Sequence, residues 1–160
     1  MDGRGNGRAG RVLIGLVHAE TRRRKGDAEG VALQIDELSS IAIEEAIAIH
    51  RELGPGLFES VYESVLAGRL RRRGLTVQRQ VLVKAVFDGE TYDPAFKIDL
   101  LVDERLVLEI KAVEQLSKTH AKQILTYLRL LKQPVGLLLN FSGATMKDGI
   151  RRVVNDYKPD

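Results

Sequence analysis

Hydrophobic positions from residue 36 onward repeat first with a helical period and later with the period of strands. Apolar residues recur every three or four positions over residues 38–53, which predicts a helix that begins near Asp36 and ends at Gly54-Pro55-Gly56. A second helical pattern covers residues 57–73. Gly74 follows it and is typical of the left-handed position that closes a helix.

The pattern then changes to alternation. Residues 77–84 alternate in polarity, and Asp88-Gly89 is typical of a turn. Two further strands are predicted at about residues 95–102 and 106–113, separated by a short polar break centred on Glu104.

The last third of the chain returns to a helix and then to one apolar run. Ser117 can cap a third helix that reaches about residue 132. Residues 135–141 are continuous enough in their hydrophobicity to form a strand buried on both faces, and a last helix is predicted at 146–154. The order α-α-β-β-β-α-β-α, with a helical crossover to a buried strand, predicts an α/β fold with a mixed β-sheet flanked by helices.

Composition sets the domain organisation. Of the 160 residues, 44% are apolar and 29% are charged, as in an ordinary globular protein. Residues 1–33 are rich in glycine and arginine without a period, which predicts a disordered leader before one domain at 34–157. The absence of cysteine excludes disulfides and thiolate sites and fits a cytoplasmic protein. No apolar run reaches the roughly 18 residues that span a membrane.

The net charge of +3 comes from the leader alone. Residues 1–30 carry seven basic and four acidic side chains, whereas the rest of the chain carries 18 of each sign. The predicted domain is therefore not a broadly basic nucleic-acid binder. The leader is either a flexible tail, or the product of a start placed too far upstream, or a basic arm that contacts phosphates.

Three charged residues lie inside runs that otherwise predict buried strands: Asp99, Glu109 and Lys111. Buried carboxylates need compensation by a cation. Alternation places Glu109 and Lys111 on one face, and a turn centred on Glu104 places Asp99 directly across from Glu109. Two carboxylates at this spacing suit a shared divalent cation such as Mg²⁺ or Mn²⁺, with the lysine aimed at the chemistry.

Ordinary structural roles are compatible with the same residues. Asp99 fits a turn at a strand end, and Glu109 with Lys111 fits a solvent-facing ion pair. A shift of the register by one residue would separate the faces and destroy the site. His50 and His120 lack a ligand pair at helical spacing, so neither is predicted to bind metal. His50 fits a structural role best, while His120 fits either role.

Asp99 followed by Glu109-Ile110-Lys111 resembles the signature of the PD-(D/E)XK nuclease superfamily, whose core order matches the one predicted above. A longer stretch, residues 49–62, resembles the hallmark of the GxxExxY family, with Gly56, Glu59 and Tyr62 at the named positions. Two later blocks, at residues 123–128 and 136–141, are also similar to that family. The resemblance covers about residues 38–154.

The resemblance implies a role for each site residue. Asp99, Glu109, the backbone carbonyl of Ile110, and Glu59 from the second helix would bind the metal. Lys111 would orient or activate the attacking water, or offset charge on the phosphate. Gln123 and Tyr127, one helical turn apart, would contact the phosphate, the substrate backbone or the lysine.

The implied function is a Mg²⁺- or Mn²⁺-dependent nuclease that hydrolyses phosphodiester bonds, with DNA as the expected substrate. The alternative is a weakly active or inactive nuclease-fold module that binds nucleic acid or protein. A neutral domain of this size would need a local basic groove, a partner protein or a homo-oligomer to hold DNA. If the site is a nuclease centre, the carboxylates of Asp99 and Glu109 converge, and Lys111 and Glu59 line one pocket beside them.

Overall fold

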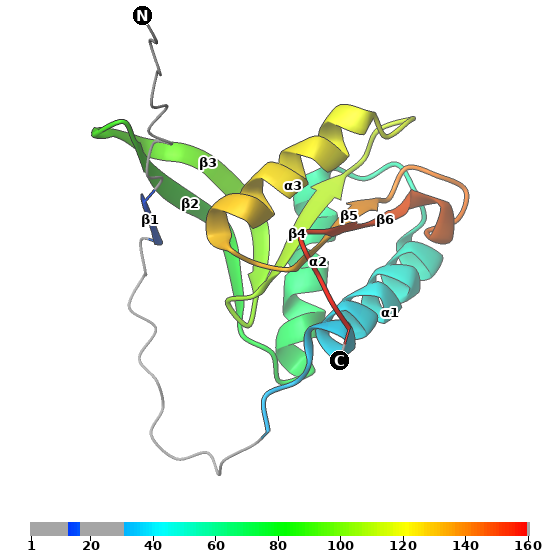
Figure 1. Cartoon of the computed structure of the whole chain (residues 1–160). Helices are drawn as coiled ribbons and strands as arrows, with labels where there is room; N and C mark the ends of the chain where they lie inside the picture. Colours follow the sequence, from blue (N-terminus) through cyan, green and yellow to red (C-terminus); the bar gives the residue numbers. More distant parts are fainter. Residues whose placement is uncertain (1–12, 17–30, 160) are drawn as a thin grey trace, which may run out of the picture.

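The computed structural model describes residues 13–16 and 31–159. These residues form six strands and three α-helices around one sheet (Figure 1). The strands are β1 (Leu13–Leu16), β2 (Val77–Phe87), β3 (Glu90–Val102), β4 (Leu106–Lys111), β5 (Val135–Asn140) and β6 (Ile150–Val154). The helices are α1 (Ile35–Leu53), α2 (Glu59–Arg72) and α3 (Lys118–Leu131), with a short 3-10 turn η1 (Lys147–Gly149) before β6.

The three predicted helices before β5 are confirmed, and their ends follow local chemistry. Helix α1 ends at Leu53, and Gly54 follows it with φ 67° and ψ −178°, a conformation that is almost confined to glycine. Helix α2 begins at Glu59, two residues later than predicted. Ser117 caps α3 by accepting a hydrogen bond from the backbone N–H of His120 at 3.4 Å.

The sheet is mixed, as predicted. Its strands lie in sequence order, and all neighbours are antiparallel except β4 and β5, which are parallel. Helix α3 makes the crossover between those two strands, because parallel neighbours cannot be joined by a hairpin. All six residues of β5 are buried, which confirms the strand predicted from its continuous hydrophobicity.

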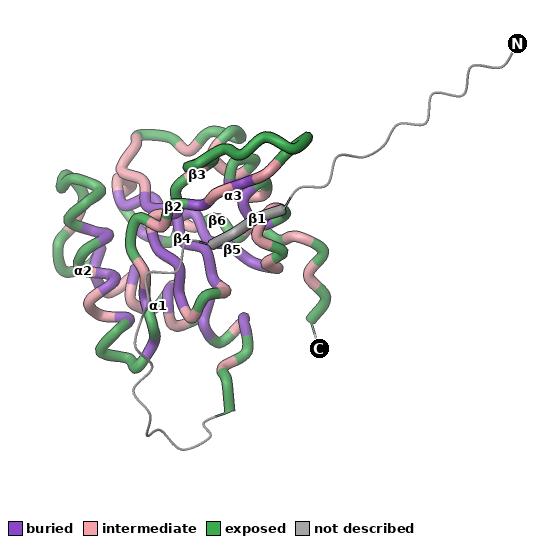
Figure 2. Tube along the Cα trace, turned by 90° about the vertical axis from the view of Figure 1, so that its left-hand side faces the viewer, coloured by how far each residue is buried: buried purple, intermediate pink, exposed green. Residues whose placement is uncertain are grey.

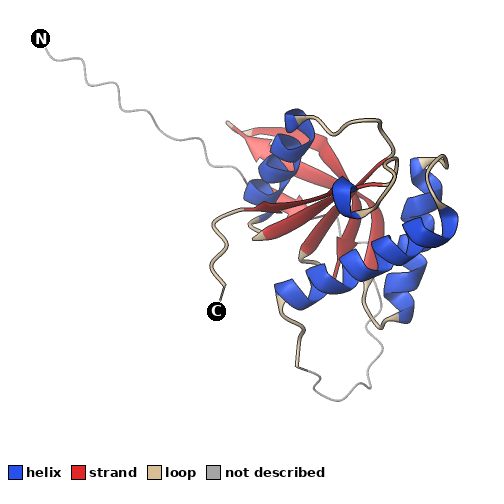
Figure 3. Ribbon diagram, turned by 90° about the vertical axis from the view of Figure 1, so that its right-hand side faces the viewer, coloured by secondary structure: helices blue, strands red, loops and turns tan. Residues whose placement is uncertain are grey.

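Helices cover both faces of the sheet (Figure 3). Helices α1 and α2 pack on one face, in a core that includes Leu100, Leu108 and Leu137. Helix α3 packs on the other face through Ile124 and Leu128. The buried residues follow the central strands, whereas the tip of the β2–β3 hairpin is exposed (Figure 2). The buried Glu109, on the central strand β4, therefore lies between helices on both faces of the sheet.

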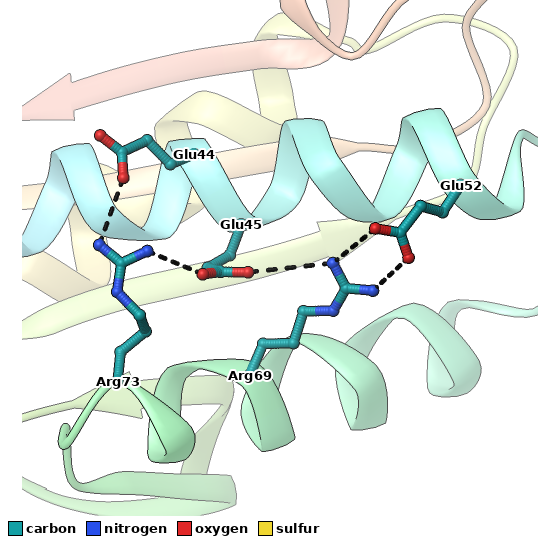
Figure 4. Close-up of polar contacts among 5 residues, drawn as sticks. All are labelled: Glu44, Glu45, Glu52, Arg69 and Arg73. Carbon is teal, nitrogen blue, oxygen red and sulfur yellow. Dashed lines mark hydrogen bonds and ion pairs between the residues drawn. The ribbon is translucent and has the colours of Figure 1, made fainter.

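Helices α1 and α2 are also joined by a group of ion pairs at the surface, which we call the arginine cluster (Figure 4). Arg69 Nη2 lies 2.5 Å from Glu52 Oε2, and Arg73 Nη1 lies 2.9 Å from Glu45 Oε1. Glu45 also approaches Arg69, at 4.0 Å, and Glu44 lies 3.3 Å from Arg73. Arg69 and Arg73, at the end of α2, thus bind the neighbouring helix.

The predicted final helix is wrong. Residues 150–154 form strand β6, antiparallel to β5, after the single turn η1. Gly149 permits this arrangement, since a Cβ there would lie 2.0 Å from the carbonyl oxygen of Asn140. The chain therefore passes close to the end of β5 and continues along its edge instead of turning into a helix.

The leader, predicted as disordered over residues 1–33, lies largely outside the described residues. Within it, residues 13–16 form β1, which pairs with β2 from Leu13↔Val86 to Leu16↔Val83. The sequence pattern did not predict this strand. None of the helices in the described part of the chain is long and apolar enough to cross a membrane.

Candidate active site

The hairpin of β3 and β4 has the predicted register. Val102 pairs with Leu106 and Leu100 with Leu108, around a turn in which Glu104 has a φ of 59°. The backbone ladder ends there, one pair before Asp99 and Glu109. Asp99 and Glu109 were expected to form the next directly opposed pair of the ladder, and this expectation is corrected. Hydrogen bonds from their side chains to the backbone of the opposite strand take the place of the backbone pair.

Asp99 and Glu109 meet in the gap where the ladder ends. Oδ2 of Asp99 accepts a hydrogen bond from the backbone N–H of Ile110 at 2.9 Å, and Oε1 of Glu109 accepts one from the backbone N–H of Asp99 at 3.4 Å. Each carboxylate therefore binds the backbone of the opposite strand. These hydrogen bonds fix the rotamers of both side chains, so the two carboxylates are held next to each other.

Burial and like charge act strongly on Glu109, which is only 6% exposed. Burial, followed by the negative charge of Asp99, raises the pKa of Glu109 to about 8, and the charge of Lys111 opposes the shift. Glu109 therefore holds a proton near neutral pH when no cation is present. The alternatives of an isolated turn aspartate and a solvent-facing ion pair do not fit this arrangement.

Residues of α3 approach the same carboxylates from one side of the sheet. Tyr127 is buried, and its ring stacks on Phe96 with centroids 4.2 Å apart. Burial raises the pKa of Tyr127, Glu109 and Asp99 add to the shift, and the side chain of Gln123 opposes it. The predicted pair on α3 is thus close to the carboxylates.

A pocket of about 630 Å³ opens on the side of the sheet that faces α2. It is lined by Asp99 and Glu59, together with Leu57, Phe58, Ser60, Glu63, Gln80, Lys97, Ile110 and Ala112. Glu109 and Lys111 are absent from this lining, so the expectation of one pocket shared by Lys111 and Glu59 is wrong. Alternation explains it: Ile110 and Ala112 face the pocket, and Glu109 and Lys111 face the other way. Asp99 lines the pocket and also contacts Glu109, so it connects the two faces of the sheet.

The residues of the predicted motif hold the loop that borders this pocket. Gly56 has a φ of 106°, a conformation that strongly favours glycine. The hydroxyl of Tyr62 donates to the carbonyl of Gly54 at 2.6 Å and accepts from the backbone N–H of Leu57 at 3.2 Å. Oε1 of Glu59 accepts from the backbone N–H of Ala112 at 3.1 Å. The loop is therefore fastened at both ends, to α2 and to the end of β4.

Three polar residues near Asp99 were not predicted from the sequence. Glu63 is 4% exposed, binds Arg79 Nη2 at 2.9 Å, and accepts a hydrogen bond from the side-chain amide of Gln80. That amide also lies 3.3 Å from Oδ1 of Asp99. A signal was present, because Glu63 follows Glu59 by one helical turn on α2, on the same face. Arg79, Glu63 and Gln80 together form a chain that ends on the catalytic candidate Asp99.

Gln80 owes its orientation to an unusual backbone. Its φ is 51°, and the β2–β3 ladder skips it between Arg79↔Leu100 and Val81↔Ile98, opposite Asp99. Non-glycine residues at positive φ are uncommon and cluster at functional sites. The backbone distortion thus lies at the centre of the candidate site.

The two histidines have structural roles, as predicted for His50. Nε2 of His50 lies 2.8 Å from the carbonyl oxygen of Gly143. His120 completes a capping box, since its Nδ1 accepts from the backbone N–H of Ser117 at 3.2 Å.

The donor set fits a hard divalent cation, although only in part. Asp99 and Glu109 supply two carboxylates whose mutual repulsion a cation would relieve, and the carbonyl of Ile110 belongs to the same strand as Glu109. Within residues 31–159, no three His, Cys, Asp or Glu side chains are grouped closely enough to hold a metal by themselves. Glu59 borders the pocket but binds the backbone of Ala112, so its role as a ligand stays a prediction.

Comparison with known proteins agrees with this geometry. The family model of the PD-(D/E)XK nuclease superfamily matches residues 36–153, which include both carboxylates, the lysine, helices α2 and α3, and all of α1 except its first residue. Comparisons with curated proteins and with solved structures gave no match. The superfamily typically uses divalent metals, which is consistent with the paired carboxylates. The chain belongs to the PD-(D/E)XK nuclease superfamily.

Proposed function

We propose that this protein is a metal-dependent nuclease that hydrolyses phosphodiester bonds of nucleic acid, with DNA as its substrate and Mg²⁺ or Mn²⁺ as its cofactor. The observation that carries the proposal is that the side chains of Asp99 and Glu109 meet. Burial and the like charge of the two carboxylates favour the binding of a cation there. Superfamily membership supports a nuclease. A cytoplasmic location and a GxxExxY affiliation, the latter supported by the loop contacts of Glu59 and Tyr62, belong to the same proposal.

The chain's own residues divide the work of the reaction. Asp99, Glu109 and the carbonyl of Ile110 would hold the cation, which when bound supplies electrostatic stabilisation of the phosphate. Lys111 lies on the same strand face as Glu109, where its ammonium group orients the attacking water and offsets charge that develops on the phosphate. Tyr127 and Gln123, on α3, would contact the lysine from the side of the sheet that carries Glu109 and Lys111. Gln80 and Glu63 keep Asp99 in place.

A second candidate function is a nuclease-fold module that binds nucleic acid or protein without appreciable turnover. One observation favours it: the described residues contain no group of three side chains able to hold a metal. Glu59 would need to leave the backbone of Ala112 before it could join Asp99 and Glu109. The two functions differ in whether cleavage depends on the paired carboxylates.

The deciding experiment is incubation of the purified protein with labelled single- and double-stranded DNA and RNA, in Mg²⁺, Mn²⁺ or EDTA. We expect cleavage that requires the metal and is lost in a variant carrying Asp99→Ala and Lys111→Ala. Arg73→Ala is the matched control, since Arg73 lies in the arginine cluster and should leave cleavage intact. Cleavage that persists in the double variant would place the activity elsewhere, and metal binding without any cleavage would favour the binding module.

A further inference from the structure

Phe58 is exposed at the border of the pocket that contains Asp99. Its side chain is 83% exposed, whereas the other three phenylalanines of the chain are buried, stacked or at the hairpin tip. Phe58 also occupies the N-cap of α2, a position that favours Ser, Thr, Asp or Asn because their oxygens cap the helix. Neither burial nor helix capping explains a phenyl group at this position.

The exposure of Phe58 is fixed by its neighbours. Leu57 donates its backbone N–H to Tyr62, and Glu59 accepts from the backbone of Ala112, so the residues on both sides of Phe58 are held. Tyr62 itself is fully buried and stacks on Phe141 with ring centroids 4.4 Å apart. The loop therefore presents the phenyl group in a defined place instead of leaving it free to fold back onto the core.

The surroundings of Phe58 suit a nucleotide. Lys97, an exposed cation, and Asp99 line the same pocket as Phe58. An aromatic ring beside a cation is the combination with which proteins hold unpaired nucleotides, because bases stack on the ring and the cation attracts the phosphate. Since residues 31–160 carry equal numbers of acidic and basic side chains, general electrostatic attraction cannot supply much of the affinity.

We propose that Phe58 is a stacking platform for an unpaired nucleobase, and that the pocket takes single-stranded or locally unpaired nucleic acid. This inference rests on the proposed nuclease function for the role of Asp99. A base stacked on Phe58 would bring the adjoining phosphate between Lys97 and Asp99. In a duplex the base faces are covered by their neighbours, so Phe58 would reach a base only at an end, a loop or a flipped nucleotide.

The absence of tryptophan from the chain makes the proposal directly measurable. Phe58→Trp introduces a single tryptophan that keeps an aromatic platform and reports on stacking through its fluorescence. Phe87→Trp is the matched control, because Phe87 is 47% exposed and is the last residue of β2, at the tip of the β2–β3 hairpin. It lies seven residues along the strand from Gln80 and is therefore roughly 20 Å away from it. Both variants are made together with Asp99→Asn, so that substrate is bound and not cleaved.

The probes are a short oligothymidylate, the same strand without bases, and the matched duplex. We expect the oligothymidylate to quench Trp at position 58 and not at position 87, and the strand without bases to quench neither. The duplex offers accessible base faces only at its two ends, so it should quench Trp at position 58 far less than the single strand does. By fluorescence anisotropy, Phe58→Ala should weaken binding of the oligothymidylate about tenfold, while Phe58→Trp retains it.

Equal quenching by the strand without bases, or unchanged affinity in Phe58→Ala, would overturn the proposal. Self-association of the wild-type protein that Phe58→Ala abolishes, with no effect on oligothymidylate binding, would assign the phenyl group to a protein contact instead. Failure of the two proposals is distinguishable. Quenching by the oligothymidylate without cleavage by the wild-type protein would contradict the proposed hydrolysis alone. Metal-dependent cleavage without quenching would contradict the proposed stacking alone.

Discussion

Two groups of charged residues in this protein are built in opposite ways. In the arginine cluster every cation meets a carboxylate (Figure 4). The hydrogen bonds between them lower the pKa of Glu52 and raise the pKa values of Arg69 and Arg73, so these three groups are held in their charged forms. At the end of the β3–β4 ladder, two carboxylates meet instead. Burial there raises the pKa of Glu109 to about 8.

The difference separates charges that serve the fold from charges that serve a ligand. The arginine cluster is complete within the chain and lies at the surface, where ion pairs add little stability. The carboxylate pair costs folding free energy until a cation binds. Natural proteins retain such unfavourable groups mainly where activity requires them.

The strongest test of this contrast exchanges one charge in each region. Asp99→Asn should lower metal-dependent cleavage by about 10²- to 10⁴-fold, on the scale for a positioned catalytic group, while the metal-free protein becomes no less stable. Arg69→Ala should leave cleavage unchanged. Cleavage rates and chemical denaturation of both variants check the prediction, and a large loss of stability in Asp99→Asn would contradict it.

The raised pKa of Glu109 predicts how stability depends on pH. The ordinary value is 4.5 and the value in the fold is about 8, so the native state binds the proton more tightly than the unfolded chain. Metal-free protein should therefore lose stability as pH rises from about 4.5 through 8, by about 5 kcal/mol in total. Glu109→Gln should flatten this slope in denaturation measured across that range.

Added Mg²⁺ provides the companion measurement, since a bound cation replaces the proton. In wild-type protein it should raise the melting temperature most above pH 8, and in Glu109→Gln it should have little effect. A pH slope that survives in Glu109→Gln would assign the titration to other groups.

Glu63 gives a smaller effect that combines both kinds of charge. It is buried like Glu109 yet paired like the arginine cluster, through Arg79 and Gln80. Glu63→Ala should cost about 1–3 kcal/mol of unfolding free energy and reduce cleavage through misplacement of Asp99. Glu63→Gln, which keeps the amide contact to Gln80, should restore part of the cleavage without restoring the ion pair. Equal cleavage in both variants would show that Glu63 acts on the fold alone.

The smallest effect is expected in the arginine cluster itself. Arg69→Ala should cost about 0.5–1 kcal/mol at low salt and less at high salt, because exposed ion pairs are weak and screened. Denaturation at two ionic strengths checks this. A loss that is independent of salt would mean that the aliphatic part of Arg69 matters through packing.

Local signals predicted most of the fold, and they predicted that Asp99 and Glu109 meet at the β3–β4 hairpin. Helical periods, Gly54 and Gly74 located α1 and α2, and the polar break centred on Glu104 fixed the hairpin register. Strand alternation then correctly predicted that Glu109 and Ile110 point to opposite faces of the sheet. These features depend on residues close in sequence, which is why one sequence suffices to find them.

The rest depended on contacts between distant segments. Strand β6 exists because Gly149 allows the chain to pass close to Asn140, and the pattern of residues 150–154 alone fits a helix equally well. The chain from Glu63 through Gln80 to Asp99 joins three elements, and it relies on a positive φ at Gln80 that no sequence rule predicts for glutamine. Alternation also explains why Lys111 does not line the pocket, but only after the structure shows which face of the sheet α2 covers.

Strand β6 also forms one edge of the sheet. Its outer edge carries two successive arginines, Arg151 and Arg152, both exposed, and Arg152 is tied to Asp36 at 2.5 Å. Short strands with charged side chains resist pairing with the edge of another molecule. The protein can thus keep a nearly all-apolar strand, β5, one position inside the border without offering neighbouring copies a template for aggregation.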